Sequence, residues 1–169
     1  MLKGKRAMEI FYEQFITKDY GNIQKKFYNI RHTLLILAIM SAIFVGSFAV
    51  IIFLFGYIML GFIAGNIFLE YEYEITENQL VITKIMNKKR RKIITTLNIE
   101  ELVSAKNIED VNNEKIKVVN ACIENNNALK ETVLIINKDS VPIGFKIAMD
   151  KKLLNMCRKI NPVCFNNII

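Results

Sequence analysis

The chain divides into one long apolar run and a following region in which apolar and polar residues alternate. Residues 33–69 contain no Asp, Glu, Lys or Arg, whereas both flanks are rich in these residues. A single helix through the run would be about 55 Å long, and the hydrocarbon core of a bilayer is only about 30 Å thick. The run therefore predicts two membrane-spanning helices, over about 29–48 and 50–69, with a turn near Gly46 and Ser47.

The turn between the two spans must reach the far headgroup region, because unpaired backbone groups are costly in lipid. One tilted span with a re-entrant segment is the alternative arrangement. Basic residues flank the run on both sides, and a hairpin places both flanks on one side, which the positive-inside rule makes the cytoplasm. The sequence thus predicts a multi-pass protein of the cell membrane with both termini in the cytoplasm.

Residues 1–28 form a predicted cytoplasmic segment before the hairpin. Within it, residues 7–17 place Met8, Phe11 and Phe15 at near-helical spacing, with acidic residues opposite. This spacing predicts an amphipathic helix. Its apolar face either lies along the inner headgroup layer or packs on the cytoplasmic domain.

Residues 70–169 predict a mostly β cytoplasmic domain. Three glutamates alternate with Tyr71, Tyr73 and Ile75, as in a half-buried strand. Alternation and polar breaks predict seven short antiparallel strands, over about 70–75, 79–86, 90–97, 101–107, 116–123, 131–137 and 141–148. A helix over about 150–160 follows, with Asp150 as its N-cap. This element order is that of a pleckstrin-homology-like (PH-like) domain, a seven-strand bent sheet or barrel capped by a C-terminal helix.

Two motifs resemble those of a known family. Residues 71–82 read YEYEITENQLVI, and a basic hairpin, NKKRRK, follows at residues 87–92. Together they resemble the opening of bacterial PH-like domains that follow transmembrane hairpins. With its C-terminal helix ending near a proline, the chain resembles a family of small bacterial membrane proteins, a domain family of unknown function. The resemblance implies the architecture, and the family has no established catalytic residues to carry over.

Groups that support catalysis or metal binding are sparse. The three cysteines are an odd number without a C-x-x-C pair, which argues against a disulfide framework and against a zinc site. The single histidine, His32, lies beside Arg31 at the edge of the apolar run. Glycine-rich phosphate loops and metal-ligand motifs are absent from the sequence. We therefore expect no enzyme, no catalytic residues, no cofactor and no metal site.

Part of the net charge of +7 lies on the basic β-hairpin at residues 87–92. The residues that we expect to contact anionic lipid or a partner are Lys84, Lys88, Lys89, Arg90, Arg91 and Lys92. Each contributes about 1 kcal/mol of attraction if held near anionic lipid. The alternative is a solvated tip whose charges keep the adjacent strands from pairing with other chains. Nucleic-acid binding would need aromatic residues interleaved with the basic ones, or a basic helix, so we expect none.

These observations favour a non-enzymatic, membrane-anchored interaction or scaffold module. Its β domain would lie at the inner membrane surface and bind anionic lipid headgroups or another membrane protein. The alternative is a small accessory subunit of a membrane enzyme or transporter complex. Ionisable residues inside the membrane would favour that alternative, and residues 33–69 contain no Asp, Glu, Lys, Arg or His.

Overall fold

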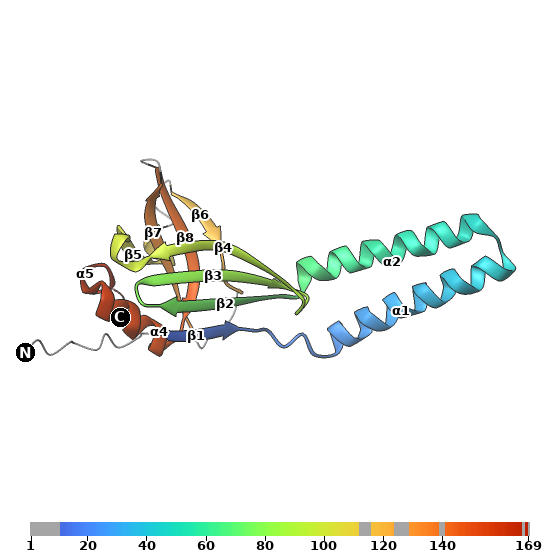
Figure 1. Ribbon diagram of the computed structural model, residues 1–169, viewed down its shortest axis with the longest axis horizontal. Helices are drawn as coiled ribbons and strands as arrows, with labels where there is room; N and C mark the ends of the chain where they lie inside the picture. Colours follow the sequence, from blue (N-terminus) through green and yellow to red (C-terminus); the bar gives the residue numbers. More distant parts are fainter. Residues whose placement is uncertain (1–10, 112–115, 124–128, 139–140, 167, 169) are drawn as a thin grey trace, which may run out of the picture. The chain divides into compact units, whose positions relative to one another are not determined.

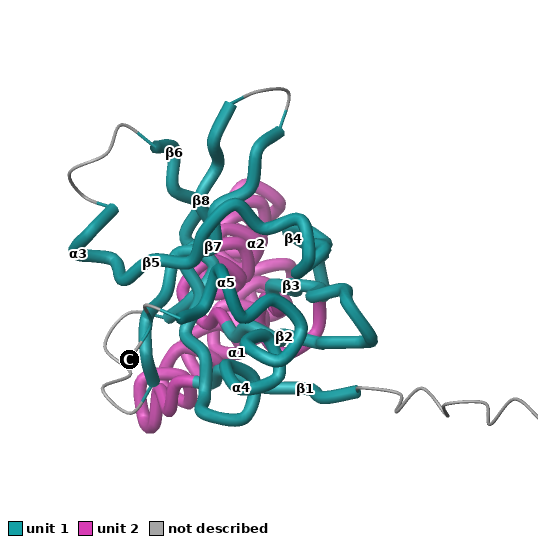
Figure 2. The backbone as a smooth tube through the Cα atoms, turned by 90° about the vertical axis from the view of Figure 1, so that its left-hand side faces the viewer, with its two compact units in different colours: residues 1–17, 70–84, 91–169 teal, residues 18–69, 85–90 magenta. Residues whose placement is uncertain are grey.

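The computed structural model describes residues 11–111, 116–123, 129–138, 141–166 and 168. The chain forms two compact units, coloured separately in Figure 2. One unit comprises residues 1–17, 70–84 and 91–169, and the other comprises residues 18–69 and 85–90. Residues 85–90 are the tip of a β-hairpin, so this tip belongs to the same unit as the apolar helices.

Two long helices, α1 (Gly21–Phe44) and α2 (Ser47–Ile67), run antiparallel in that unit (Figure 1). They are joined at Val45 and Gly46, and Gly46 has a φ of 114°, which glycine adopts without steric strain. α1 begins before the predicted span, because the polar stretch that precedes the apolar run is also helical. Both helices are long and apolar enough to cross a membrane.

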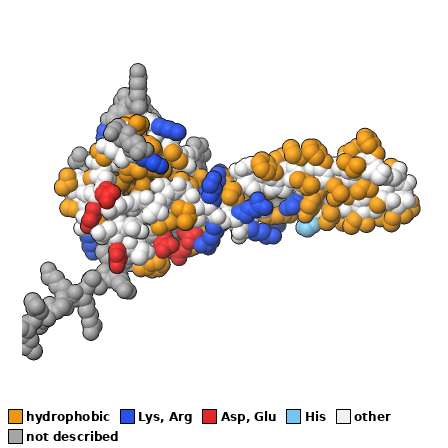
Figure 3. Space-filling view, turned by 45° about the horizontal axis from the view of Figure 1, so that its top comes forward, with side chains coloured by type: hydrophobic (Ala, Val, Ile, Leu, Met, Phe, Trp, Pro, Cys, Tyr) orange, Lys and Arg blue, Asp and Glu red, His pale blue; other side chains and the backbone are white. Residues whose placement is uncertain are grey.

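The apolar side chains of these helices point outward. In the most apolar window of each helix, only 11% of α1 and 6% of α2 is buried. Figure 3 shows hydrophobic side chains covering the hairpin, with Lys and Arg side chains gathered toward one of its ends. The core helix of a soluble protein buries such side chains. An exposed apolar surface of this size is typical of a helix that lies in a membrane or against another protein.

Glycines of α2 allow the two helices to approach closely. A Cβ added to Gly56 would lie 3.5 Å from Leu34, and one added to Gly61 would lie 3.1 Å from the guanidinium carbon of Arg31. An added Cβ on Gly65 would meet no atom within 4 Å. Gly56 and Gly61 therefore serve packing within the hairpin, whereas Gly65 borders open space.

The rest of the chain forms two four-stranded sheets and C-terminal helices. The first sheet has the order β1-β2-β3-β4, formed by β1 (Phe11–Ile16), β2 (Leu69–Thr76), β3 (Gln79–Met86) and β4 (Arg90–Asn98). The second has the order β5-β7-β8-β6, formed by β5 (Ser104–Asn107), β6 (Lys117–Asn120), β7 (Lys130–Lys138) and β8 (Val141–Met149). The short helices are η1 (Ile99–Glu101), α3 (Ile108–Val111), α4 (Lys151–Ile160) and α5 (Pro162–Phe165).

All seven predicted strands are present, and α4 follows them as predicted. The described strands form two sheets rather than one closed barrel. One pairing was predicted wrongly: β6 runs parallel to β8, with Lys117 opposite Ile143. The reason is that β5 occupies the free edge of β7, so β6 pairs instead with β8, which runs in the same direction.

The predicted amphipathic helix over residues 7–17 is wrong in its described part, and residues 7–10 lie outside the described residues. Residues 11–16 form β1, which pairs antiparallel with β2, so that Phe11 lies opposite Thr76. Residues four apart share a face in a strand as well as in a helix, so the spacing of the aromatic residues fits both. Residues 11–16 form a strand because they pair with the edge of β2. The sheet unit thus takes strands from both sides of the helical hairpin, rather than from residues 70–169 alone.

Side-chain hydrogen bonds join β1 to the junction between β8 and α4. The Tyr12 hydroxyl donates to Oδ2 of Asp150 at 2.5 Å. Gln14 donates to the carbonyl of Ala148 and accepts from the backbone N–H of Asp150, both at 3.0 Å. Oδ1 of Asp150 accepts from the N–H of Leu153 at 2.7 Å, which confirms the predicted N-cap of α4.

Tyr12→Phe should lower the free energy of unfolding of the full-length protein in detergent by about 1 to 2 kcal/mol. The hydrogen bond to the Asp150 carboxylate, followed by burial, raises the pKa of Tyr12 to about 12. The contribution of this hydrogen bond to the free energy of unfolding is therefore complete below the unfolded-state pKa of tyrosine, about 10. It is lost as the pH rises toward 12. We expect the difference between wild type and variant to stay constant from pH 7 to 9 and then shrink. A difference that persists unchanged at pH 12 would contradict this assignment.

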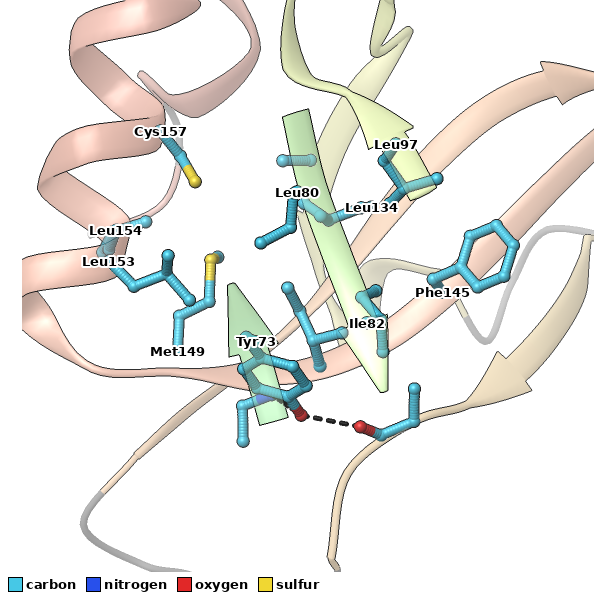
Figure 4. Packing of buried hydrophobic residues seen from close by; sticks show 14 of the residues in the cluster. Tyr73, Leu80, Ile82, Leu97, Leu134, Phe145, Met149, Leu153, Leu154 and Cys157 are labelled. Atoms are coloured by element: carbon cyan, nitrogen blue, oxygen red, sulfur yellow. Dashed lines mark hydrogen bonds between the residues drawn. The ribbon is translucent and has the colours of Figure 1, made fainter. Parts of the chain in front are cut away.

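One hydrophobic core joins the two sheets and α4. In Figure 4, Leu80 and Ile82 of the first sheet lie near Leu134 of the second, and the sulfur of Cys157 on α4 points toward them. Tyr73 on β2 is fully buried in this core. Its hydroxyl donates to the carbonyl of Ala121 at 2.6 Å and accepts from the N–H of Ala148 at 3.3 Å (Figure 4 draws the first bond). Ala148 belongs to β8, so Tyr73 ties the two sheets together.

The cysteines differ in their expected reactivity. Cys157 is fully buried, and burial raises its pKa to about 12, so its thiolate is scarce at neutral pH. Cys164 is only partly buried. We expect a maleimide at pH 7 to modify Cys164 well before Cys157 in the native protein, as measured by peptide mass spectrometry over time. Equal rates at the two positions would contradict the placement of Cys157 in the core.

Candidate functional site

A tight turn joins β3 to β4 and carries the basic motif. Asn87 and Lys88 have φ angles of 52° and 56°, the two successive positive values of a type I′ turn. The N–H of Lys89 closes the turn by donating to the carbonyl of Met86 at 3.1 Å. Asparagine tolerates the left-handed conformation better than most residues, which suits Asn87 to this position. The basic side chains therefore project from a tight two-residue turn.

The tip packs against the ends of α1 and α2 that are remote from their connecting turn. The N–H of Asn87 donates to the carbonyl of Phe68 at 2.8 Å, and the Asn87 side-chain oxygen accepts a hydrogen bond from the Tyr28 hydroxyl on α1. The ring of Phe68 is surrounded by those of Tyr20, Phe27 and Tyr28, at centroid distances of 5.0, 5.6 and 6.5 Å. One backbone and one side-chain hydrogen bond therefore hold the tip on the helices, at a residue that aromatic rings pack in place.

A cleft of about 450 Å³ lies between the tip and the two helices. Its lining consists of three basic residues, two asparagines, and a wall that is mostly apolar: Arg31, Lys89 and Arg90; Asn66 and Asn87; and Tyr57, Ile58, Gly61, Phe62, Gly65 and Met86. No acidic residue is among them. We call this site the basic cleft. Its positive charge and its apolar wall together favour a ligand that has an anionic part and an apolar part.

Arg31 reaches the basic cleft from α1. Its guanidinium carbon lies 4.2 Å from the centre of the Tyr57 ring, a cation–π geometry, and against the backbone of Gly61. Its Nε atom is buried and has no hydrogen-bond partner among the described residues. A buried donor without a partner costs about 1–3 kcal/mol. Among the residues that line the cleft, Arg31 carries a buried side-chain donor that no described group satisfies.

The depth of Arg31 along α2 distinguishes it from the other basic residues. At about 1.5 Å per residue, Gly61 lies about 21 Å from the start of α2 at Ser47, and about 9 Å of helix remain before Ile67. If α2 spans a core of about 30 Å, the Arg31 guanidinium lies below the near boundary rather than outside it. A charge at the bilayer centre costs about 2.5–3.5 kcal/mol on insertion scales and less toward the boundary. Arg31 thus gains from any counter-charge that can reach the cleft.

The six predicted contact residues are divided between the two units. Lys89 and Arg90 line the basic cleft, and neither forms an ion pair with a described carboxylate. Lys88 is exposed at the second turn position. Lys84 and Lys92 lie on β3 and β4 and belong to the other unit.

Arg91 is bound within the first sheet. Its Nη1 lies 3.1 Å from Oε1 and 2.9 Å from Oε2 of Glu72 on β2. Glu72 is only 4% exposed. Its burial, followed by a hydrogen bond with Glu13, raises the pKa of Glu72, while Arg91 opposes that shift. Arg91 therefore forms an ion pair within the sheet.

Sequence reasoning missed Arg31 and Asn66 as site residues. Arg31 stands just before the uncharged run, so it was counted as a flanking charge. One signal was available: two antiparallel helices that turn at Gly46 place Arg31 opposite Gly61, where the missing side chain leaves room for a guanidinium.

The comparison with family models identifies this architecture. A model described as "Bacterial PH-like domain (DUF6106)" matches residues 8–166. The match covers the apolar helices, both sheets and the C-terminal helices. No curated protein and no solved structure matches the chain. The resemblance inferred from the acidic-aromatic strand and the basic hairpin is confirmed, and the chain belongs to this family of bacterial PH-like domains.

Proposed function

We propose that this chain is a non-enzymatic, membrane-anchored binding module of the cell membrane. The hairpin of α1 and α2 crosses the bilayer and returns, and the PH-like unit works at the cytoplasmic surface. The outward apolar surface of the two helices is the observation that carries the proposal, because it is stable only in an apolar surrounding. The non-enzymatic role rests on the sequence, which contains no catalytic motif.

The distribution of charge supports this orientation. Lys25, Lys26 and Arg31 lie in the half of α1 remote from Gly46, and Lys89 and Arg90 line the same cleft as Arg31. Positive residues at membrane boundaries favour the cytoplasmic side. The end of the hairpin at Gly46 would then face the opposite side of the membrane.

Fractionation of cells that express the full-length chain tests the anchor. We expect the protein to stay in the membrane pellet after extraction with alkaline carbonate and with high salt, and to be released by detergent. Alkaline carbonate strips peripheral proteins but leaves spanning helices in place. Release by carbonate or salt would overturn the proposal.

The binding role needs its own measurement. Affinity purification of the full-length protein in mild detergent, followed by quantitative protein and lipid mass spectrometry, should enrich a specific lipid or protein over a matched tagged membrane protein. If neither is enriched in repeated purifications, the binding role is contradicted even when the anchor is confirmed.

A second candidate, the accessory subunit of a membrane complex, is favoured by the depth of Arg31. An ionisable residue at this level can pair with an acidic residue of a neighbouring transmembrane helix. Under this candidate, one multi-pass protein is recovered at a constant ratio to the chain, and Arg31→Gln lowers its recovery. Equal recovery with wild type and Arg31→Gln would count against it.

A further inference from the structure

We propose that the basic cleft holds the phosphate of an anionic phospholipid, with the lipid's glycerol and upper acyl chain lying along the apolar wall of α2. This inference rests on the membrane placement proposed above and adds the ligand of the site. The fit depends on three properties of the cleft: its charge, its apolar wall and its level along the helices.

The charge of the basic cleft matches a phosphodiester. Arg31, Lys89 and Arg90 bring three positive charges to a lining that contains no carboxylate, and Asn66 adds an amide. Guanidinium groups bind phosphate oxygens through paired N–H donors, which suits both arginines. Nε of Arg31 is buried beside Gly61, in a guanidinium that lies over the Tyr57 ring, so the pair of donors that would face a phosphate is the one formed by Nη1 and Nη2.

The opposite wall of the cleft matches a lipid rather than a small soluble anion. The apolar lining includes Ile58 and Phe62 of α2 and Met86 of β3, and Gly65 leaves space because no atom lies within 4 Å of the place where its Cβ would be. A soluble phosphate would gain nothing from this wall. A phospholipid buries its glycerol and the first methylenes there while its phosphate meets the basic residues.

The level of the cleft also fits a lipid headgroup. The tip that carries Lys89 and Arg90 is hydrogen-bonded to Phe68, the residue directly after α2, whereas Arg31 lies about 9 Å below the end of α2. A headgroup drawn slightly inward between these levels contacts all three cations. It also supplies a counter-charge to Arg31. A lipid is favoured over the acidic residue of a partner helix because one phosphate with its acyl chain matches all three cations and the apolar lining, whereas a single carboxylate matches only Arg31.

Lipid titration of the purified full-length protein in non-ionic detergent, followed by native mass spectrometry, tests the proposal. The probes are phosphatidylglycerol and, as the matched lipid without net charge, phosphatidylcholine. We expect the first phosphatidylglycerol to bind at least tenfold more tightly than phosphatidylcholine. Each cation near an anionic headgroup contributes about fivefold. Arg31→Gln should therefore weaken phosphatidylglycerol binding about fivefold, and the exposed double variant Lys89→Gln/Arg90→Gln about 25-fold.

Two further variants separate a specific site from general charge. Lys92→Gln removes the same charge outside the cleft and should change the affinity less than twofold. Gly65→Leu keeps every charge but fills the space beside the apolar wall, and it should abolish preferential binding of the first lipid. Each variant is also checked by thermal unfolding. Lys89 and Arg90 are exposed, so their replacement by Gln should leave the core unchanged.

Several results would overturn the proposal. These are equal affinities for the two lipids, equal effects of Arg31→Gln and Lys92→Gln, an unaffected Gly65→Leu variant, and displacement of the lipid by inorganic phosphate at millimolar concentration. A transmembrane partner that is lost with Arg31→Gln while lipid binding is unchanged would assign the cleft to that partner instead. Carbonate extraction does not depend on Arg31, so a failed lipid titration with an intact anchor would reject only the lipid site.

Discussion

Tyr73→Phe should lower the free energy of unfolding of the full-length protein by about 2 to 4 kcal/mol. The ring stays in place, so packing is conserved, but two hydrogen bonds are lost, one to β8 and one to the residue that follows β6. The carbonyl of Ala121 and the N–H of Ala148 each lose a bond to the Tyr73 hydroxyl. A buried group left without a partner costs about 1–3 kcal/mol. Burial raises the pKa of Tyr73, so the hydroxyl remains protonated throughout the usual pH range.

Chemical unfolding in detergent measures this loss of stability. The unfolding is followed by circular dichroism, because the chain contains no Trp whose fluorescence could report it. Tyr12→Phe is the matched control, because it removes one hydroxyl whose hydrogen bond is only partly buried. We expect the loss at Tyr73 to exceed the loss at Tyr12. A Tyr73→Phe variant within about 0.5 kcal/mol of wild type would show that the two sheets do not depend on this hydroxyl.

Phe55→Asp combined with Ile58→Asp should prevent stable integration into the membrane. Both side chains are 64% exposed, and both lie near the middle of α2. An aspartate at the centre of a spanning helix costs about 2.5–3.5 kcal/mol, so the pair costs about 5–7 kcal/mol in addition to the lost apolar contribution. We expect the fraction that resists carbonate extraction to fall at least tenfold.

The control for this variant applies the same chemical change outside the helices. Ile93 and Val163 are also exposed apolar residues, at 63% and 83%. Ile93→Asp combined with Val163→Asp should leave the protein in the membrane pellet, because neither residue belongs to α1 or α2. Loss of integration in the control alone, or no loss in the α2 variant, would contradict a spanning role for α2.

Local patterns predicted most of the fold. β3 and β8 were predicted from the alternation of apolar and polar residues, and the start of α4 from the capping carboxylate of Asp150. Both signals depend on neighbours within a few residues in the sequence. The strand at residues 11–16 was missed because its aromatic spacing is shared by a helix and a strand. The parallel pairing of β6 with β8 depends on which edge β5 occupies, and that is a property of the whole sheet.

The candidate site was only partly predictable for a related reason. The run of basic residues correctly marked the turn, including Lys89 and Arg90. It also included Arg91, whose carboxylate partner, Glu72, lies on the neighbouring strand rather than next to it in sequence. Arg31 joins the cleft only through the antiparallel packing of α1 on Gly61. Contacts made across the fold therefore decide which members of a charge cluster can meet a ligand.

Cysteine labelling of living cells with a membrane-impermeant maleimide tests most directly whether the hairpin crosses the membrane and returns. Cys164→Ser removes the most accessible native thiol, and Ser47→Cys or Lys92→Cys is then added to that background. Ser47 lies at the turn between the helices, and Lys92 follows the basic tip. A spanning hairpin predicts that Ser47→Cys is labelled in intact cells and that Lys92→Cys is labelled only after permeabilisation. Labelling of Lys92→Cys in intact cells would contradict it.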